Sequence, residues 1–82
     1  MTISEWFYSI IKKHKLNHGH LAKLMGISKG SFNNKLNPKH SATFLSGEKV
    51  KLRDILVEMR IDLENIPDVD FNEALKTLTN GK

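Results

Sequence analysis

The sequence predicts an all-α fold, a five- to six-helix bundle formed by a single short chain. Apolar residues recur at helical spacing along most of the chain. Residues that cap helices stand in front of several of these runs. The 82 residues are 39% hydrophobic and include six aromatic side chains. This composition is enough for a small core and differs from that of a disordered chain.

The first predicted helix starts near Thr2, because Thr2 and Glu5 have the spacing of a capping box. Its apolar stripe has helical periodicity and comprises Ile3, Trp6, Phe7, Ile10 and Ile11. We expect Tyr8, on the opposite side, to be exposed. We expect His14 to pack at the edge of the stripe.

Two short helices joined by a tight turn are predicted within residues 18–37, over about 18–25 and 29–36. Asn17 and Ser28 suit the two N-caps, and Gly26 suits the C-cap between them. The first helix has an apolar face of Leu21, Leu24 and Met25. Phe32 and Leu36 lie four residues apart and should point inward together. Two helices joined in this way form a helix-turn-helix, whose second helix enters the major groove of DNA.

The same stretch resembles the helix-turn-helix of the phage repressor and Cro-like family, also called the xenobiotic-response-element type. The matching residues are Leu16, Asn17, Leu21, Ala22, Gly26, Ile27 and Phe32, with Met59, Ile61, Asp62, Leu63 and Ile66 further on. The resemblance covers residues 5–66 and implies a DNA-binding regulator of bacteria, phage or another mobile element. His18 replaces the family's usual Gln, which braces a phosphate; Lys35 stands at an often apolar position, and Arg60 at a usual Gly.

The second half of the chain is expected to be helical as well. Asn37-Pro38 should end the third helix, and Phe44 and Leu45 should return the following loop to the core. Ser46 should cap a helix over about 47–59. The expected core face of that helix is Leu52, Ile55, Leu56 and Met59.

A short fifth helix is predicted from Asp62 to near Pro67, and a last one from about Asp70 to Asn80-Gly81. We therefore predict a DNA-binding domain over 1–67 and a C-terminal helix within 68–82. A helix this short is unstable alone, so it should dock on the core or on a second copy of the chain.

Charge is distributed unevenly along the sequence. The net charge is +4, but residues 1–53 carry ten basic and two acidic residues, whereas residues 54–82 carry three basic and seven acidic residues. A basic half that contains the predicted helix-turn-helix is typical of a nucleic-acid-binding protein. A basic face exposed to solvent without a partner is the simpler interpretation of the charge alone.

The candidate site residues follow from the predicted motif. The base-contacting set on the second helix is Lys29, Gly30, Asn33 and Asn34, because Lys suits guanine, Asn suits adenine and Gly permits close approach. The phosphate-contacting set is His18, Lys23, Ser28, Lys35, Lys39, His40 and Thr43. Each of these is also an ordinary surface residue type.

A homodimer on double-stranded DNA is expected, because one unit contacts only a few base pairs. The residues considered for its interface are Val50, Val57, Phe71, Leu75 and Leu78. The alternative is a protein-interaction module, adaptor or antitoxin-like, whose last helix lies in a partner's groove. RNA binding is a third and weaker interpretation.

Other functional classes find little support in the sequence. The four histidines lack the spacing of a metal site, and no nucleophile–base pair or phosphate-binding glycine loop occurs. We therefore expect no enzyme, cofactor, metal or small-molecule ligand. With no cysteine, signal peptide or membrane span, a cytoplasmic protein is expected.

Overall fold

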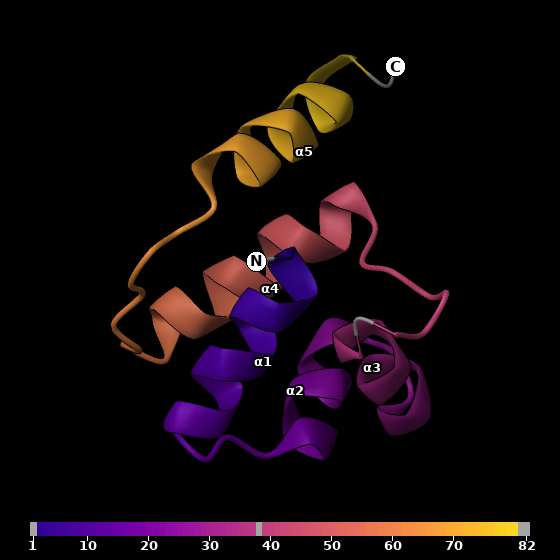
Figure 1. The fold of residues 1–82 in the computed structure, drawn as a ribbon, viewed down its shortest axis with the longest axis vertical. Coiled ribbons are helices and arrows are strands. Elements are labelled where there is room, and N and C mark those ends of the chain that lie inside the picture. Colours follow the sequence, from indigo (N-terminus) through magenta and orange to yellow (C-terminus); the bar gives the residue numbers. More distant parts are fainter. Residues whose placement is uncertain (1, 38, 81–82) are drawn as a thin grey trace. The chain divides into compact units, whose positions relative to one another are not determined.

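The computed structural model describes residues 2–37 and 39–80, which form five α-helices and no strand (Figure 1). They are α1 (Ile3–Lys13), α2 (His18–Met25), α3 (Lys29–Leu36), α4 (Ser46–Glu58) and α5 (Asp68–Asn80). The predicted all-α class is confirmed. Pro38 and Gly81, expected to follow the third and last helices, lie outside the described residues.

The chain forms two compact units, one ending at Phe44 and the other beginning at Leu45. The first unit contains α1, α2 and α3, and the second contains α4 and α5. This division differs from the predicted boundary after residue 67. The reason is that α5 packs on α4.

Aromatic side chains form the centre of the first unit. Phe7 of α1 and Phe32 of α3 are both fully buried. Phe44, which follows the loop after α3, meets Phe7 edge-on at 5.4 Å and Phe32 at 6.1 Å between ring centroids. Such edge-to-face pairs stabilise a core beyond the area that they bury. Phe44 therefore returns the loop to the core as predicted, whereas Leu45 is 66% exposed and does not.

A buried hydroxyl connects α1 with α3 in this unit. Ser4 donates a hydrogen bond of 2.8 Å to the backbone oxygen of Lys35. That oxygen lies in the last turn of α3, where carbonyl groups have no partner within their own helix. The side chain of Ser4 thus satisfies one of these carbonyls.

The apolar face of α1 is close to the prediction, and that of α2 differs from it at Leu24. The stripe of α1 is buried except for the half-buried Ile3, and Tyr8 is exposed as expected. The predicted burial of Leu24 is wrong, since this side chain is 43% exposed. Leu21, Ala22 and Met25 fill the buried face of the eight-residue α2 without it.

The second unit is an antiparallel pair of helices. Arg53 of α4 lies over the ring of Phe71 of α5, with 4.9 Å between the guanidinium carbon and the ring centroid. Nearer the start of α4, a Cβ on Gly47 would meet Leu78 at 3.7 Å. Leu52, Leu56, Phe71 and Ala74 are buried. Of the two alternatives for the last helix, docking within the chain accounts for its buried face.

The boundaries of α4 correct two details of the prediction. Leu45, not Ser46, is the N-cap residue, and the Glu48 carboxylate accepts a hydrogen bond of 2.9 Å from the Leu45 backbone N–H. Met59 is the C-cap and is 38% exposed, so it does not belong to the core face.

The predicted helix over 62–67 is absent, and residues 61–67 form a non-helical connection. Asn65 lies in the left-handed region with φ +54°. A six-residue segment that contains such a residue makes too few hydrogen bonds to offset helix nucleation.

Candidate nucleic-acid interface

Local capping positions α2 and α3 around their short connection. The side chains of Asn17 and Ser28 accept hydrogen bonds from the backbone N–H groups of His20 and Ser31, at 2.9 and 3.1 Å. Gly26 ends α2 with φ +76°, a conformation that L side chains rarely adopt. The predicted caps are confirmed, and they place α3 next to α2.

The helix α3 has one buried and one exposed face. Phe32 and Leu36 are buried, whereas Lys29, Gly30, Asn33 and Asn34 are all exposed. A Cβ added at Gly30 would meet nothing within 4 Å in the part of the chain that the structure describes, so packing there does not require glycine. All four residues predicted to contact bases thus share the open side of one helix.

One contact within this face was not expected from the sequence. The Nδ1 atom of His18, at the start of α2, lies 2.7 Å from the Oδ1 atom of Asn33 on α3. The same imidazole packs edge-on against Phe32, with 5.9 Å between ring centroids. His18 was predicted to contact a phosphate and Asn33 a base, and the structure joins the two side chains. No periodicity could reveal a pair fifteen positions apart on different helices.

A surface hollow of about 680 Å³ lies beside this pair. Its lining residues come from α1, α2, α3 and the loop after α3: Tyr8, His18, Asn33, Leu36, Asn37 and Lys39. Tyr8 was expected only to be exposed, and its phenol joins the polar groups of this hollow. A tyrosine standing opposite the apolar stripe of α1 was the only sequence signal for it.

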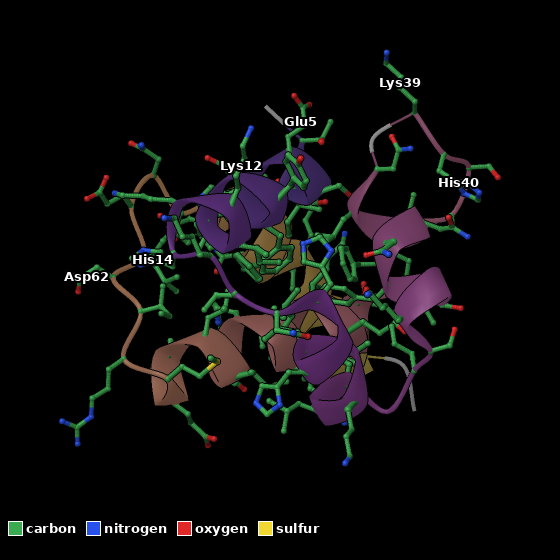
Figure 2. The ribbon with its side chains drawn as sticks, turned by 90° about the horizontal axis from the view of Figure 1, so that it is seen from below. Glu5, Lys12, His14, Lys39, His40 and Asp62 are labelled. Atoms are coloured by element: carbon green, nitrogen blue, oxygen red, sulfur yellow. The ribbon has the colours of Figure 1, made fainter. Side chains whose placement is uncertain are left out.

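The remaining residues predicted to contact phosphates lie on α2, on α3 and in two connections. Lys23, Lys39, His40 and Thr43 are exposed, and Lys35 is half-buried. Figure 2 shows Lys39 projecting outward from the loop after α3, with His40 further along the same loop. The Nδ1 atom of His40 accepts a hydrogen bond of 3.1 Å from the Ala42 backbone N–H, and Asn37 Oδ1 accepts one of 3.0 Å from the Lys39 N–H. These bonds order the backbone of the loop.

The first unit is strongly basic. Its sequence contains seven lysines and one acidic residue, Glu5. Thr2 donates its backbone N–H to Glu5 Oε1 at 3.1 Å, and the Thr2 hydroxyl accepts from the Glu5 N–H at 3.2 Å. The bond from the Thr2 backbone and the interaction with the Thr2 side chain lower the pKa of Glu5. Glu5 therefore stays ionised at neutral pH as part of the α1 cap and leaves the unit with a net positive charge.

The residues considered for a dimer interface have different environments. Phe71 is 2% exposed because it packs within the second unit, and Val50 is half-buried. Phe71 is therefore unavailable to a second copy of the chain. Val57, Leu75 and Leu78 are 55%, 40% and 48% exposed and remain open to a partner.

Comparisons with known proteins identify no relative: no family model, curated protein or solved structure matches the chain. Within residues 2–37 and 39–80, no group of three or more His, Asp and Glu side chains is placed to hold a metal ion. None of the helices in this part of the chain has the length and apolar character needed to cross a membrane.

Proposed function

We propose that the first unit is a helix-turn-helix domain that binds double-stranded DNA in a sequence-specific manner, as a repressor-like transcription regulator. The observation that supports this most strongly is the exposed face of α3. Lys29, Gly30, Asn33 and Asn34 are all exposed, whereas Phe32 and Leu36 of the same helix are buried. Side chains with hydrogen-bonding edges on one side of an anchored helix are what major-groove recognition requires.

The dimensions of α3 suit this role. An α-helix with its side chains is about 10–12 Å across, and the major groove is about 12 Å wide, so α3 can enter the groove. In this proposal Lys29, Asn33 and Asn34 contact bases. Gly30 allows the backbone of α3 to approach the base edges.

Phosphate contacts would flank the groove. Lys23 on α2 and Lys39 in the loop after α3 supply cations from different elements. Lys35, His40 and Thr43 extend this set, and the Ser28 hydroxyl can still donate its proton while it caps α3. Such contacts orient the protein on the duplex without distinguishing sequences.

The primary test is selection of bound duplexes from a random pool at near-physiological salt, followed by affinity measurements on the selected sequence. The double variant Asn33→Ala/Asn34→Ala should lose preference for that sequence and keep salt-sensitive binding to all duplexes. Lys39→Ala should weaken binding to every duplex and reduce the salt slope by about one unit. No enrichment of any sequence by the wild-type chain would reject the proposal.

Gly30→Ala tests how closely α3 approaches the bases. Alanine favours a helix over glycine by about 1 kcal/mol, and the new methyl group would meet no atom of the described residues within 4 Å. The variant should therefore be more stable and yet bind the selected duplex more weakly, because its methyl group would enter the groove. Unchanged DNA affinity in a stabilised variant would contradict a close approach of α3 to the bases.

A protein-interaction module is the second candidate, favoured by exposed apolar side chains on α5. Leu75 and Leu78, three positions apart, are 40% and 48% exposed. Neighbouring apolar side chains on one side of a helix suit a helix-binding partner groove. In that case the Asn33→Ala/Asn34→Ala variant would bind its partner as well as the wild type does, and Leu78→Asp would not.

A further inference from the structure

The His18–Asn33 pair has two possible hydrogen-bonding patterns. In the observed arrangement Nδ1 of His18 lies 2.7 Å from Oδ1 of Asn33, so the imidazole must donate a proton to the amide oxygen. A charged imidazole always carries a proton on Nδ1, and a neutral one carries it in only one of its two tautomers. In the other tautomer Nδ1 is an acceptor, and the Asn33 amide must turn over to present its nitrogen.

These two patterns leave different groups of Asn33 free to contact a base. When Nδ1 donates, Oδ1 keeps one lone pair and Nδ2 keeps both hydrogens. The amide can then accept from adenine N6 and donate to adenine N7 at the same time. When the amide turns over, its oxygen and nitrogen exchange places. In the same approach to adenine, the amide nitrogen would then face the N6 donor and the amide oxygen would face the N7 acceptor, so neither hydrogen bond could form.

We propose that His18 is a positioning residue whose protonation holds the Asn33 amide in the orientation that pairs with adenine, so that base preference strengthens as the pH falls. The inference rests on the proposed function of α3. In this proposal His18 contacts Asn33 and not the DNA. Its charge affects the base preference through the orientation of the Asn33 amide.

The surroundings of His18 contain no competing carboxylate among the residues that line the hollow. The titratable groups there are Tyr8 from α1 and Lys39 from the loop, and the Lys29 side chain of α3 approaches the neighbouring Gly19. The Phe32 ring lies edge-on to the imidazole, with 5.9 Å between the ring centroids. Asn33 is thus the acceptor that the structure provides for a proton on Nδ1.

The test is the ratio of affinities for two duplexes, the selected sequence and the same sequence with adenine replaced at the position contacted by Asn33. Measuring it at about pH 8 and about pH 5.5 spans the range in which imidazoles change charge. The ratio removes the general gain in affinity that any added positive charge produces. We expect it to rise by about two- to fivefold at the lower pH, as the competent orientation becomes the only one.

Three variants make the test specific. His18→Gln supplies an amide donor that does not titrate, so the preference should persist and become independent of pH. His18→Ala should give a lower preference that is also independent of pH. His20→Ala removes an exposed histidine of the same helix and should keep the wild-type response. A ratio that does not change with pH in the wild type, or that changes equally in His18→Gln, would overturn the inference.

A second measurement does not require DNA. The side-chain amide resonances of Asn33 in nuclear magnetic resonance spectra of the whole chain should shift with the same midpoint as the His18 ring, and should lose this response in His18→Gln. Independence of the two groups would overturn the inference even if DNA binding is specific. Coupled titration without any sequence preference would instead reject the proposed function and, with it, the role of the pair in specificity.

Discussion

At the scale of single residues, Ser4 contributes to the first unit through one hydrogen bond. Its hydroxyl is buried and donates to the Lys35 backbone oxygen at 2.8 Å. Ser4→Ala leaves that carbonyl without this partner and should lower the free energy of unfolding by about 1 kcal/mol, measured by urea denaturation. Ser9→Ala, at an exposed position of the same helix, is the matched control and should change stability by less than about 0.5 kcal/mol. Equal effects of the two substitutions would argue against the Ser4 bond.

Glu5 gives the stability of the first unit a defined dependence on pH. Its hydrogen bonds with Thr2 lower its pKa in the folded chain. A lowered folded-state pKa means that the contribution is complete above the unfolded-state pKa and is lost as the pH falls through the folded-state value. Glu5→Gln should therefore be less stable than the wild type at neutral pH, and this difference should shrink in urea titrations below about pH 4. A difference that stays constant down to about pH 2 would show that ionisation of Glu5 is not involved.

The residue scale also shows where prediction from sequence stops. Thr2, Asn17, Gly26 and Ser28 were correctly assigned as caps, because capping depends on neighbours within a few positions. The contact between His18 and Asn33 was not foreseen, because it depends on how two helices cross. The predicted burial of Leu24 was wrong although the residue has helical spacing with Leu21. The buried face of the short helix α2 is narrow and consists of Leu21, Ala22 and Met25.

At the scale of helices, three of the five end with the same hydrogen-bond pattern but with different residues in the left-handed conformation. After α1, α2 and α4 these residues are Lys15, Gly26 and Arg60, with φ +53°, +76° and +60°. In each case the next residue donates its N–H to a carbonyl five positions earlier, the bond of a Schellman motif. Only α2 uses the residue type that adopts this conformation without strain.

Substitutions at these positions should therefore have opposite signs. Arg60→Gly relieves the left-handed strain and should raise the free energy of unfolding by about 0.5–1 kcal/mol. Gly26→Ala introduces that strain and should lower it by about 1 kcal/mol, although its Cβ would meet no atom of the described residues within 4 Å. Arg60→Ala, which keeps a side chain at the strained position, should stay close to the wild type in thermal and urea unfolding. If Arg60→Ala and Arg60→Gly stabilise the chain equally, the gain comes from removal of the arginine side chain and not from relief of backbone strain.

Helix-scale prediction succeeded where apolar periodicity and capping residues agreed, as for α1, α2 and α3. It failed over 62–67, where the expectation rested on the family resemblance and on Asp62 and Pro67 as boundaries. Those signals mark where a helix could begin and end, and they do not supply the hydrogen bonds that a short helix lacks. The second unit therefore contains two helices joined by a non-helical connection. This connection follows Arg60, whose left-handed conformation ends α4.

At the scale of the whole molecule, charge and apolar exposure are divided between the two units. The first unit has seven lysines and one acidic residue, whereas the second has six basic and eight acidic residues. The second unit is thus poorly suited to a polyanion. Exposed apolar side chains of this unit, Val57 on α4 with Leu75 and Leu78 on α5, suit contact with another protein. We therefore expect DNA binding and self-association to be separable by mutation.

A variant of α5 should lose self-association and keep DNA binding by the first unit. If the chain dimerises through α5, Leu75→Asp/Leu78→Asp should convert dimers to monomers in analytical ultracentrifugation, because it places charges in an apolar interface. Phe71 and Ala74, the buried residues of α5, stay intact in this variant, and an unchanged free energy of unfolding would show that α5 still packs on α4 without the Leu78 side chain beside Gly47. The variant should retain weak binding to a single half-site and lose the tight binding to a palindrome with half-sites about ten base pairs apart. Val69→Asp, at a 71% exposed position near the start of α5, adds one negative charge elsewhere on the helix and should have little effect. If dimers persist in the double variant, Leu75 and Leu78 do not belong to the interface. If the wild-type chain binds a single asymmetric site as a monomer, the proposed dimer does not exist.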